Sequence, residues 1–313
     1  MMNPSDEDLD RIKSHANEMI FSGDGHCYLI IDPTLRDIKR DDLFFSHIRN
    51  SQCLKTPLPH PELDGVMELW IVLLDKSNQA DCELFEQSIQ YALDELSTEK
   101  LLSGQGRAIC GWVSSGLSFD QFAENISRMT IQKRPSGGES LLRFYDPAVL
   151  NIFITMIDSW QRKRFLNNID SWSYFNGDGE LCTEYGVGNG SRKMDFSLGL
   201  TEDNLEDLNN VTHINKILHR FRMMNNNQQY SESQNIQLLL PALRYFVGRF
   251  SMQDDGVIEF GLDVLNLRTC FYLGSVVNRH LPSKEHATPS SYLECKSKIT
   301  ESEWELLASA QQK

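Results

Sequence analysis

The chain has 313 residues, of which 40% are hydrophobic and 24% are charged, enough for the core and surface of one large or two ordinary globular domains. Its formal net charge is −14, and residues 1–180 carry 28 acidic against 17 basic side chains, so we expect no nucleic-acid partner. No apolar run reaches the roughly 18–20 residues of a membrane span, and the acidic start is unlike a signal peptide, so we expect a cytoplasmic protein without membrane insertion.

Short apolar runs alternate with helical patterns in the first half of the chain. The runs at 27–31, 69–74, 107–113 and 141–145 predict strands, and their continuous apolar character indicates strands that are covered on both faces. Alternation of such strands with helices is typical of βαβ units. The sequence therefore predicts an α/β N-terminal lobe with a mostly parallel sheet flanked by helices.

Several helix starts are specified by local signals. A first helix is predicted from Ser5 onward, and apolar residues spaced along 85–96 predict an amphipathic helix. Ser118 and Gln121 have the spacing of a capping box. Pro147 stands at a first-turn position, directly after Asp146, whose carboxylate can cap the helix.

The second half of the chain has a different character. Residues 176–200 hold six glycines and few apolar side chains, which indicates a loop or a domain junction. Beyond this stretch we expect a mainly α-helical lobe, with helices near 205–221, 236–250, 257–280 and 300–311. The predicted organisation is a lobe at 1–180, a glycine-rich junction at 181–199 and a helical lobe at 200–313.

A search for catalytic or metal-binding patterns finds none that conforms. The eight histidines are scattered, the seven cysteines form no CxxC pair, and the glycines at 186–190 match neither nucleotide-binding pattern. The stretch 176–180 is better explained by a turn than by a calcium loop. Ser114 and Ser115 fail the GxSxG spacing of a nucleophile elbow. We therefore expect no catalytic residue, no metal and no cofactor.

The most distinctive segment begins with Gly111 and Trp112 at a strand end. It continues through the capped helix and ends in Leu-Arg-Phe-Tyr-Asp-Pro at 142–147. On the predicted strand, Arg143 and Tyr145 share one side and Phe144 takes the other. An arginine beside a carboxylate at a strand end is either a structural clamp or a catalytic pair, and we favour the clamp.

With these motifs in this order, the sequence resembles the type VI secretion effector adaptors, also called Tap or TEC chaperones, over roughly residues 25–175. The segment at 125–128 keeps only the final Arg128 of a basic stretch usual in the family, and Ala148 stands where an arginine commonly follows Asp-Pro. The signature positions, structural or binding, are Gly111, Trp112, Arg128, Arg143, Phe144, Tyr145, Asp146 and Pro147.

The resemblance implies a non-enzymatic protein that binds a secreted effector and helps to load it onto the VgrG spike. It also implies that the C-terminal lobe gives effector specificity. There we expect two or three exposed side chains among seven aromatics, Phe221, Tyr245, Phe246, Phe250, Phe260, Phe271 and Tyr272. The alternatives are an α/β hydrolase-like enzyme that uses Ser114 or Ser115, and a structural component of the secretion machine.

Overall fold

The structure is a computed structural model that describes residues 6–21, 25–35, 42–60, 67–97, 100, 106–186, 197–224, 230–280 and 291–309. The predicted helix start at Ser5 and most of the predicted junction, residues 187–196, lie outside the described residues. The chain divides into two compact units, Met1–Glu202 and Asp203–Lys313. We call them the N-terminal and the C-terminal unit.

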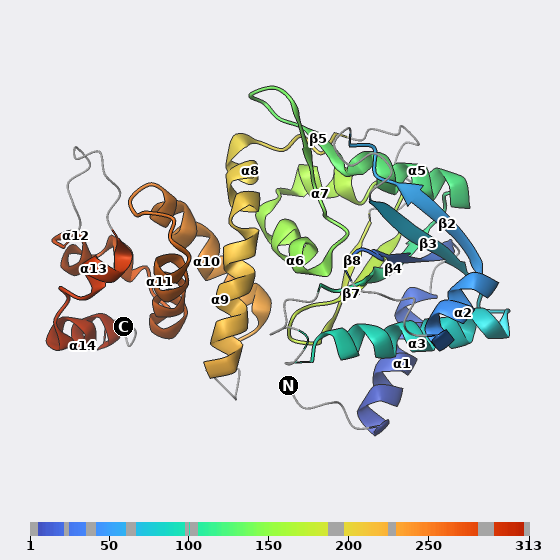
Figure 1. The fold of residues 1–313 in the computed structure, drawn as a ribbon, viewed down its shortest axis with the longest axis horizontal. Helices are drawn as coiled ribbons and strands as arrows, with labels where there is room; N and C mark the ends of the chain where they lie inside the picture. The colour runs from blue at the N-terminus through green and yellow to red at the C-terminus, as the bar shows by residue number, and fades with distance from the viewer. Residues whose placement is uncertain are drawn as a thin grey trace. The chain divides into compact units, whose positions relative to one another are not determined.

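The N-terminal unit is built on a six-stranded sheet (Figure 1). Its strands in chain order are β1 (His26–Ile31), β2 (Gln52–Pro57), β3 (Glu68–Leu74), β4 (Ile109–Ser115), β7 (Ser171–Phe175) and β8 (Leu181–Tyr185). In space they follow the order β2-β3-β1-β4-β7-β8, and every pair of neighbours is antiparallel. The prediction of a mostly parallel sheet is therefore wrong.

The reason for the error lies in how the crossovers interleave. Helix α2 (Asp42–Asn50) connects β1 to β2, and helix α3 (Gln79–Glu95) connects β3 to β4. Each helix does join two strands that run in the same direction, but β3 lies between β1 and β2, and β1 lies between β3 and β4. A continuous apolar run shows that both faces of a strand are covered; it does not fix the direction of the neighbouring strand.

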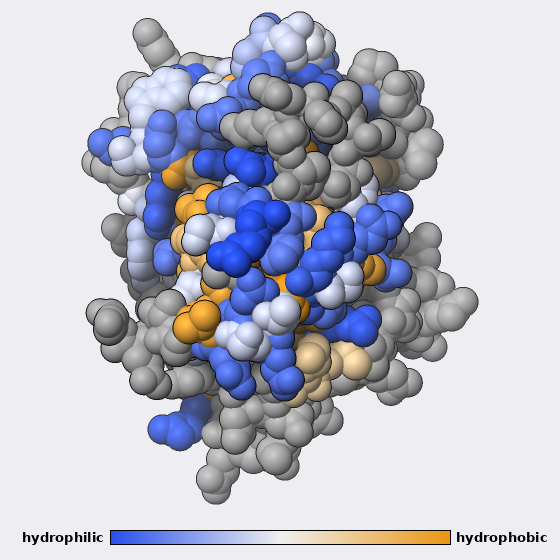
Figure 2. Space-filling view, turned by 90° about the vertical axis from the view of Figure 1, so that its left-hand side faces the viewer, coloured by the Kyte–Doolittle hydropathy of each residue, from blue (hydrophilic) through white to orange (hydrophobic). Residues whose placement is uncertain are grey.

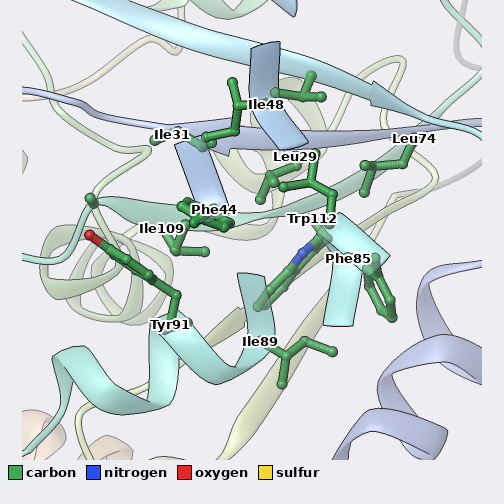
Figure 3. Close-up of a cluster of buried hydrophobic side chains, with 14 of the residues drawn as sticks. Leu29, Ile31, Phe44, Ile48, Leu74, Phe85, Ile89, Tyr91, Ile109 and Trp112 are labelled. Atoms are coloured by element: carbon green, nitrogen blue, oxygen red, sulfur yellow. The ribbon is translucent and has the colours of Figure 1, made fainter. Parts of the chain in front are cut away.

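Helices cover both faces of the sheet (Figure 1). Helix α1 (Asp6–Ile20) with α2 and α3 covers one face, and α5 (Phe119–Met129), α6 (Pro147–Met156) and α7 (Ser159–Phe165) lie on the other. Alternate residues of β1 divide between the two layers. Leu29 and Ile31 join the cluster under α1–α3, where Figure 3 shows them with Trp112, whereas Tyr28 stacks on Phe122 of α5 with ring centroids 4.1 Å apart.

The fourth predicted strand, at 141–145, is mostly irregular. Only Leu141 belongs to a strand, β6 (Glu139–Leu141), which pairs with β5 (Ile131–Lys133) in a separate two-stranded hairpin. Residues 142–146 follow as loop and turn, closed by a bond from the Asp146 N–H to the Arg143 carbonyl (3.0 Å). These apolar side chains are buried without belonging to a sheet.

The predicted turn at 176–180 is confirmed as the connection of the β7–β8 hairpin. Asn176 Oδ1 accepts the Asp178 and Glu180 N–H groups at 2.9 and 3.0 Å, and Gly179 supplies a positive φ of 82°. Part of the stretch interpreted as a loop or junction, residues 181–185, is therefore a strand of the main sheet.

The C-terminal unit is helical, as predicted. Its helices are α8, which begins at the boundary (Glu202–Asn209), α9 (Val211–Met224), α10 (Glu232–Val247), α11 (Asp254–Leu267), the short 3-10 helix η3 (Phe271–Leu273), α12 (Ser275–Asn278), α13 (Tyr292–Lys296) and α14 (Glu301–Ser309). The single helix expected near 205–221 is two helices, α8 and α9. None of the seven C-terminal aromatics is exposed, since six are buried and Tyr245 is half-buried, so the expectation of two or three exposed rings is wrong.

Local helix signals in the sequence are confirmed more fully than the topology. The Gln121 side chain accepts the Ser118 N–H at 3.3 Å, and the Asp146 carboxylate accepts the Ala148 N–H at 2.9 Å. Among the described residues, no helix combines the length and the apolar character needed to cross a membrane.

Candidate functional site

An ion cluster lies where β1 ends and β4 begins. Asp32 directly follows β1 and is 1% exposed. Its N–H donates to the Ala108 carbonyl at 2.8 Å, and its carboxylate accepts the Thr34 N–H at 2.9 Å, the Thr34 hydroxyl and Arg143 Nη2 at 2.9 Å. A buried carboxylate is tolerated only with such partners. Arg143 therefore joins the 143–146 turn to the end of β1, 111 residues earlier in the chain.

The Arg143 guanidinium also faces two other groups of the same turn. Its Nη2 lies 3.9 Å from Asp146 Oδ2, and its central carbon lies 5.8 Å from the ring centroid of Tyr145. Burial opposes the positive charge, but the neighbouring Tyr145, Asp146 and Asp32 outweigh it and raise the pKa of Arg143. Burial raises the pKa of the Tyr145 hydroxyl. The arginine therefore stays charged and the tyrosine stays neutral.

Asp146 is the N-cap of α6, and Pro147 follows in the first turn. Burial raises the pKa of Asp146, and the positive charge of Arg107 acts in the opposite direction. Arg107 is itself 8% exposed and donates from Nη1 to the Phe175 carbonyl at 2.9 Å. Two arginines and two aspartates thus hold together β1, the start of β4, the end of β7 and the 143–146 turn.

Gly111 occupies a position in β4 that other residues cannot adopt without strain. Its φ is +141°, and a Cβ at this position would lie 2.6 Å from the Ser173 carbonyl oxygen and 2.8 Å from Trp172 Nε1. The register of β1 against β4 shifts at the same place, between Ile30 and Ile31. Glycine therefore lets β7 approach β4 closely beside the irregularity.

Trp112 and Phe144 anchor the two core layers on opposite faces of the sheet. The Trp112 indole donates to Ser88 Oγ of α3 at 2.9 Å and packs edge-on against Phe85 and Phe175. Phe144 is fully buried and packs edge-on against Phe165 and Trp172, with ring centroids 5.3 and 5.9 Å apart. Both signature aromatics therefore have packing roles.

Arg128 differs from the other signature positions. It lies on α5, where it pairs with Glu124 one turn earlier at 2.7 Å, and both side chains are about half exposed. Surface pairs of this kind contribute little to stability. The cluster at 143–147 and the Gly111-Trp112 pair therefore form the buried framework, and Arg128 is a surface residue.

The geometry favours the structural interpretation of the arginine–carboxylate pair. Arg143 is held by Asp32 and the 143–146 turn, with 31% of its side chain exposed. Ser114 and Ser115 are buried, at 2% and 0% exposure, and the Ser115 hydroxyl donates to the Asn168 carbonyl. Neither serine has the exposure that a nucleophile needs. Within the described part of the chain, no group of three or more His, Cys, Asp or Glu side chains is arranged to hold a metal ion.

Three charged residues of this region were missed as site residues by the sequence analysis. Asp32 and Arg107 complete the ion cluster, and Glu95 of α3 accepts the Ala108 and Ile109 N–H groups at 2.7 and 3.2 Å. A signal was available for Asp32, because a carboxylate directly after a continuous apolar strand needs a partner. Nothing in the local sequence of Glu95 indicated that it would reach β4.

Residues 27–164 match the protein family described as Domain of unknown function (DUF4123). The matched stretch runs from β1 to Arg164 of α7 and includes all eight signature positions. The comparisons with curated proteins and with solved structures gave no match.

Proposed function

We propose that this chain is a non-enzymatic adaptor chaperone that binds a type VI secretion effector in the cytoplasm and helps to load it onto the VgrG spike. The observation that carries the proposal is the match of residues 27–164 to DUF4123, a family associated with type VI secretion effector adaptors. The proposal requires neither a metal nor a cofactor.

The character of the matched region supports a binding role over a catalytic one. Its signature side chains are mostly engaged in capping, ion pairing and aromatic packing, as described above. The two serines of the hydrolase alternative are buried. The matched domain therefore has the features of a scaffold, and the effector would bind to surfaces that the signature does not include.

The distribution of exposed apolar side chains favours the C-terminal unit as the effector-binding part. Seven of the ten large hydrophobic side chains that are exposed among the described residues lie in this shorter unit. These seven are Met223, Met224, Val247, Met252, Leu273, Leu293 and Leu306. On the face shown in Figure 2, hydrophobic residues are exposed in several places between hydrophilic ones. An effector-binding surface in this unit would bring several of these side chains together as one apolar patch with a polar rim.

The test is an affinity pull-down with the tagged full-length chain, from cells that express their own secretion genes. Recovery of one large effector, with or without VgrG, supports the proposal and identifies the client. Two leucines are then replaced, Leu273→Ser and Leu293→Ser, which are 59% and 42% exposed. The matched control is Leu43→Ser in α2, where the leucine is 61% exposed on the N-terminal unit.

We expect the C-terminal substitutions to reduce effector recovery at least fivefold, because each removes apolar contact area at the interface. The control should leave recovery unchanged. Absence of both the effector and VgrG from the pull-down, with the secretion genes shown to be expressed, would refute the adaptor function. An equal loss of effector recovery in all three variants would refute the location of the binding surface on the C-terminal unit, but not the adaptor function.

A further inference from the structure

The chain segment that enters α8, residues 197–202, is part of the N-terminal unit, and we call it the connector. Residues 197–201 have no regular secondary structure, yet Leu198 is 0% exposed and Leu200 is 5% exposed. Loops normally run over the surface with their side chains in solvent. Burial of both leucines shows that the connector departs from this rule.

Two buried glutamines bind the backbone of the connector. Gln132, 1% exposed, accepts the Leu198 N–H at 2.8 Å, and Gln161, 3% exposed, donates to the Gly199 carbonyl at 2.9 Å. Each amide is oriented by a second bond that does not involve the connector. Gln132 Nε2 donates to the Met129 carbonyl at 2.7 Å, and Gln161 Oε1 accepts the Asp158 N–H at 3.0 Å. The Gln132 oxygen and the Gln161 amide N–H are thus held in position to accept from and donate to a peptide backbone.

The side chain of Trp160 lies against Gly199, the residue between the two leucines. Gly199 has a φ of +63°, and a Cβ there would lie 2.5 Å from Cζ3 of Trp160. The indole is in turn covered by the guanidinium of Arg164, whose central carbon lies 4.6 Å from the ring centroid. A side chain larger than hydrogen would have to displace this stacked pair. The positive φ and this contact together favour glycine here, since another residue would strain the backbone and displace Trp160, which is 54% exposed.

Both ends of the connector are also held. Arg164 Nε donates to the Ser197 carbonyl at 2.7 Å, and the Ser136 N–H at the tip of the β5–β6 hairpin donates to Glu202 Oε1 at 2.8 Å. The contacts come from two elements that are distant in sequence, the hairpin and α7. We call their five contacting residues the socket: Gln132, Ser136, Trp160, Gln161 and Arg164.

We propose that the socket is a peptide-binding site of the N-terminal unit, specific for a Leu-Gly-Leu segment with a positive φ at the glycine, and occupied by the chain's own connector. The two glutamines bind the backbone, both leucine side chains are buried, and the positive φ together with Trp160 favours glycine at the centre. This inference does not depend on the identity of the effector. As a consequence, the chain enters the C-terminal unit from a segment that is bound by the socket.

The test uses the full-length chain and a fluorescently labelled peptide of residues 197–204. In the unaltered chain the tethered connector competes with the peptide at an effective concentration of order millimolar. The double variant Leu198→Asp with Leu200→Asp empties the socket, since carboxylates are not buried at these two positions without partners. We expect the peptide to bind this variant at least tenfold more tightly than the unaltered chain, measured by fluorescence anisotropy.

Peptide specificity provides the second measurement. A peptide with Gly199→Val should bind the emptied chain at least tenfold more weakly, whereas a control peptide with Asp203→Ala, altered beyond the connector, should bind as the original does. Circular dichroism verifies that the variant chain is folded, and a chain with Gly199→Val serves as the emptied form should the double variant unfold. The proposal is overturned if the folded emptied chain binds no peptide, if the unaltered chain binds it equally well, or if the valine peptide binds as tightly.

Discussion

Substitution of Gly111 by alanine tests how the framework is built, because the chain offers two matched glycines for comparison. Gly111 combines a φ of +141° with a Cβ position 2.6 Å from the Ser173 carbonyl oxygen. Gly137, at the tip of the β5–β6 hairpin, has a φ of +98° but open space around its Cβ position, and Gly116 has open space with no positive φ. The three alanine variants therefore separate backbone strain from steric overlap.

The expected magnitudes follow from this geometry. Gly116→Ala should change the free energy of unfolding by less than about 0.5 kcal/mol, the usual range for a surface substitution. Gly137→Ala should cost about 1–2 kcal/mol, because alanine rarely adopts such a φ. Gly111→Ala carries a similar strain and must also push β7 away from β4. That movement weakens the bonds of the register that joins Trp112 to Ser173, each worth about 1 kcal/mol. We expect a total of about 3–5 kcal/mol.

The assay is urea unfolding followed by tryptophan fluorescence. Four of the five tryptophans lie in the N-terminal unit, and Trp112 and Trp172 lie beside the substituted position, so the signal reports mainly on that unit. The explanation given for Gly111 fails if Gly111→Ala and Gly137→Ala are destabilised to within about 0.5 kcal/mol of each other. Steric overlap with β7 would then contribute nothing.

Three further predictions concern the ion cluster and the thiols. Arg143→Met should destabilise the N-terminal unit by about 3 kcal/mol in urea unfolding, because Asp32 stays buried without its counter-charge. Adding Asp32→Asn should restore at least half of this loss. If the effects of the two substitutions are simply additive, the two residues do not act as a clamp. The raised pKa of Asp146 means that ionisation costs more in the folded state, so the stability due to its neutral form is lost as pH rises above the unfolded value of 3.8. Asp146→Asn keeps an N-cap and cannot ionise, so it should gain stability relative to the unaltered chain between about pH 3.5 and pH 7, and a constant difference across that range would refute the shift. Cys270 is exposed whereas burial raises the pKa of Cys27, so a thiol reagent should label Cys270 in the native protein and Cys27 only after unfolding, as mass spectrometry of digested samples would show.

The sequence predicted which segments are buried better than it predicted the order and direction of the strands. The apolar runs at 27–31 and 69–74 correspond to β1 and β3, and the division of their side chains between two covered faces follows from a period of two. Strand order depends on contacts between residues far apart in the chain, which no local pattern contains. The same limit explains the error at 141–145, where Leu142, Phe144 and Tyr145 are buried as a strand would be, but in a turn.

The candidate site was predictable where its parts are local. The cap of α6 by Asp146 needs only two neighbouring residues, so it was found. Arg143 was identified, but its partner was not, because Asp32 lies 111 residues earlier. The role of Gly111 depends on the approach of β7, and the sequence shows the glycine without the strand that makes it necessary.

The signature residues of the family resemblance have mainly structural roles. Seven of the eight signature positions serve packing, capping or ion pairing in the N-terminal unit, so their presence identifies a scaffold more directly than it identifies a partner. Substitutions at these positions are expected to reduce binding through unfolding. Substitution of a side chain that contacts the proposed effector should reduce binding without a change in stability, as we expect for Leu273 on the C-terminal unit, which is 59% exposed. Measuring stability and effector recovery on the same variants therefore distinguishes the residues that hold the scaffold from those that make the interface.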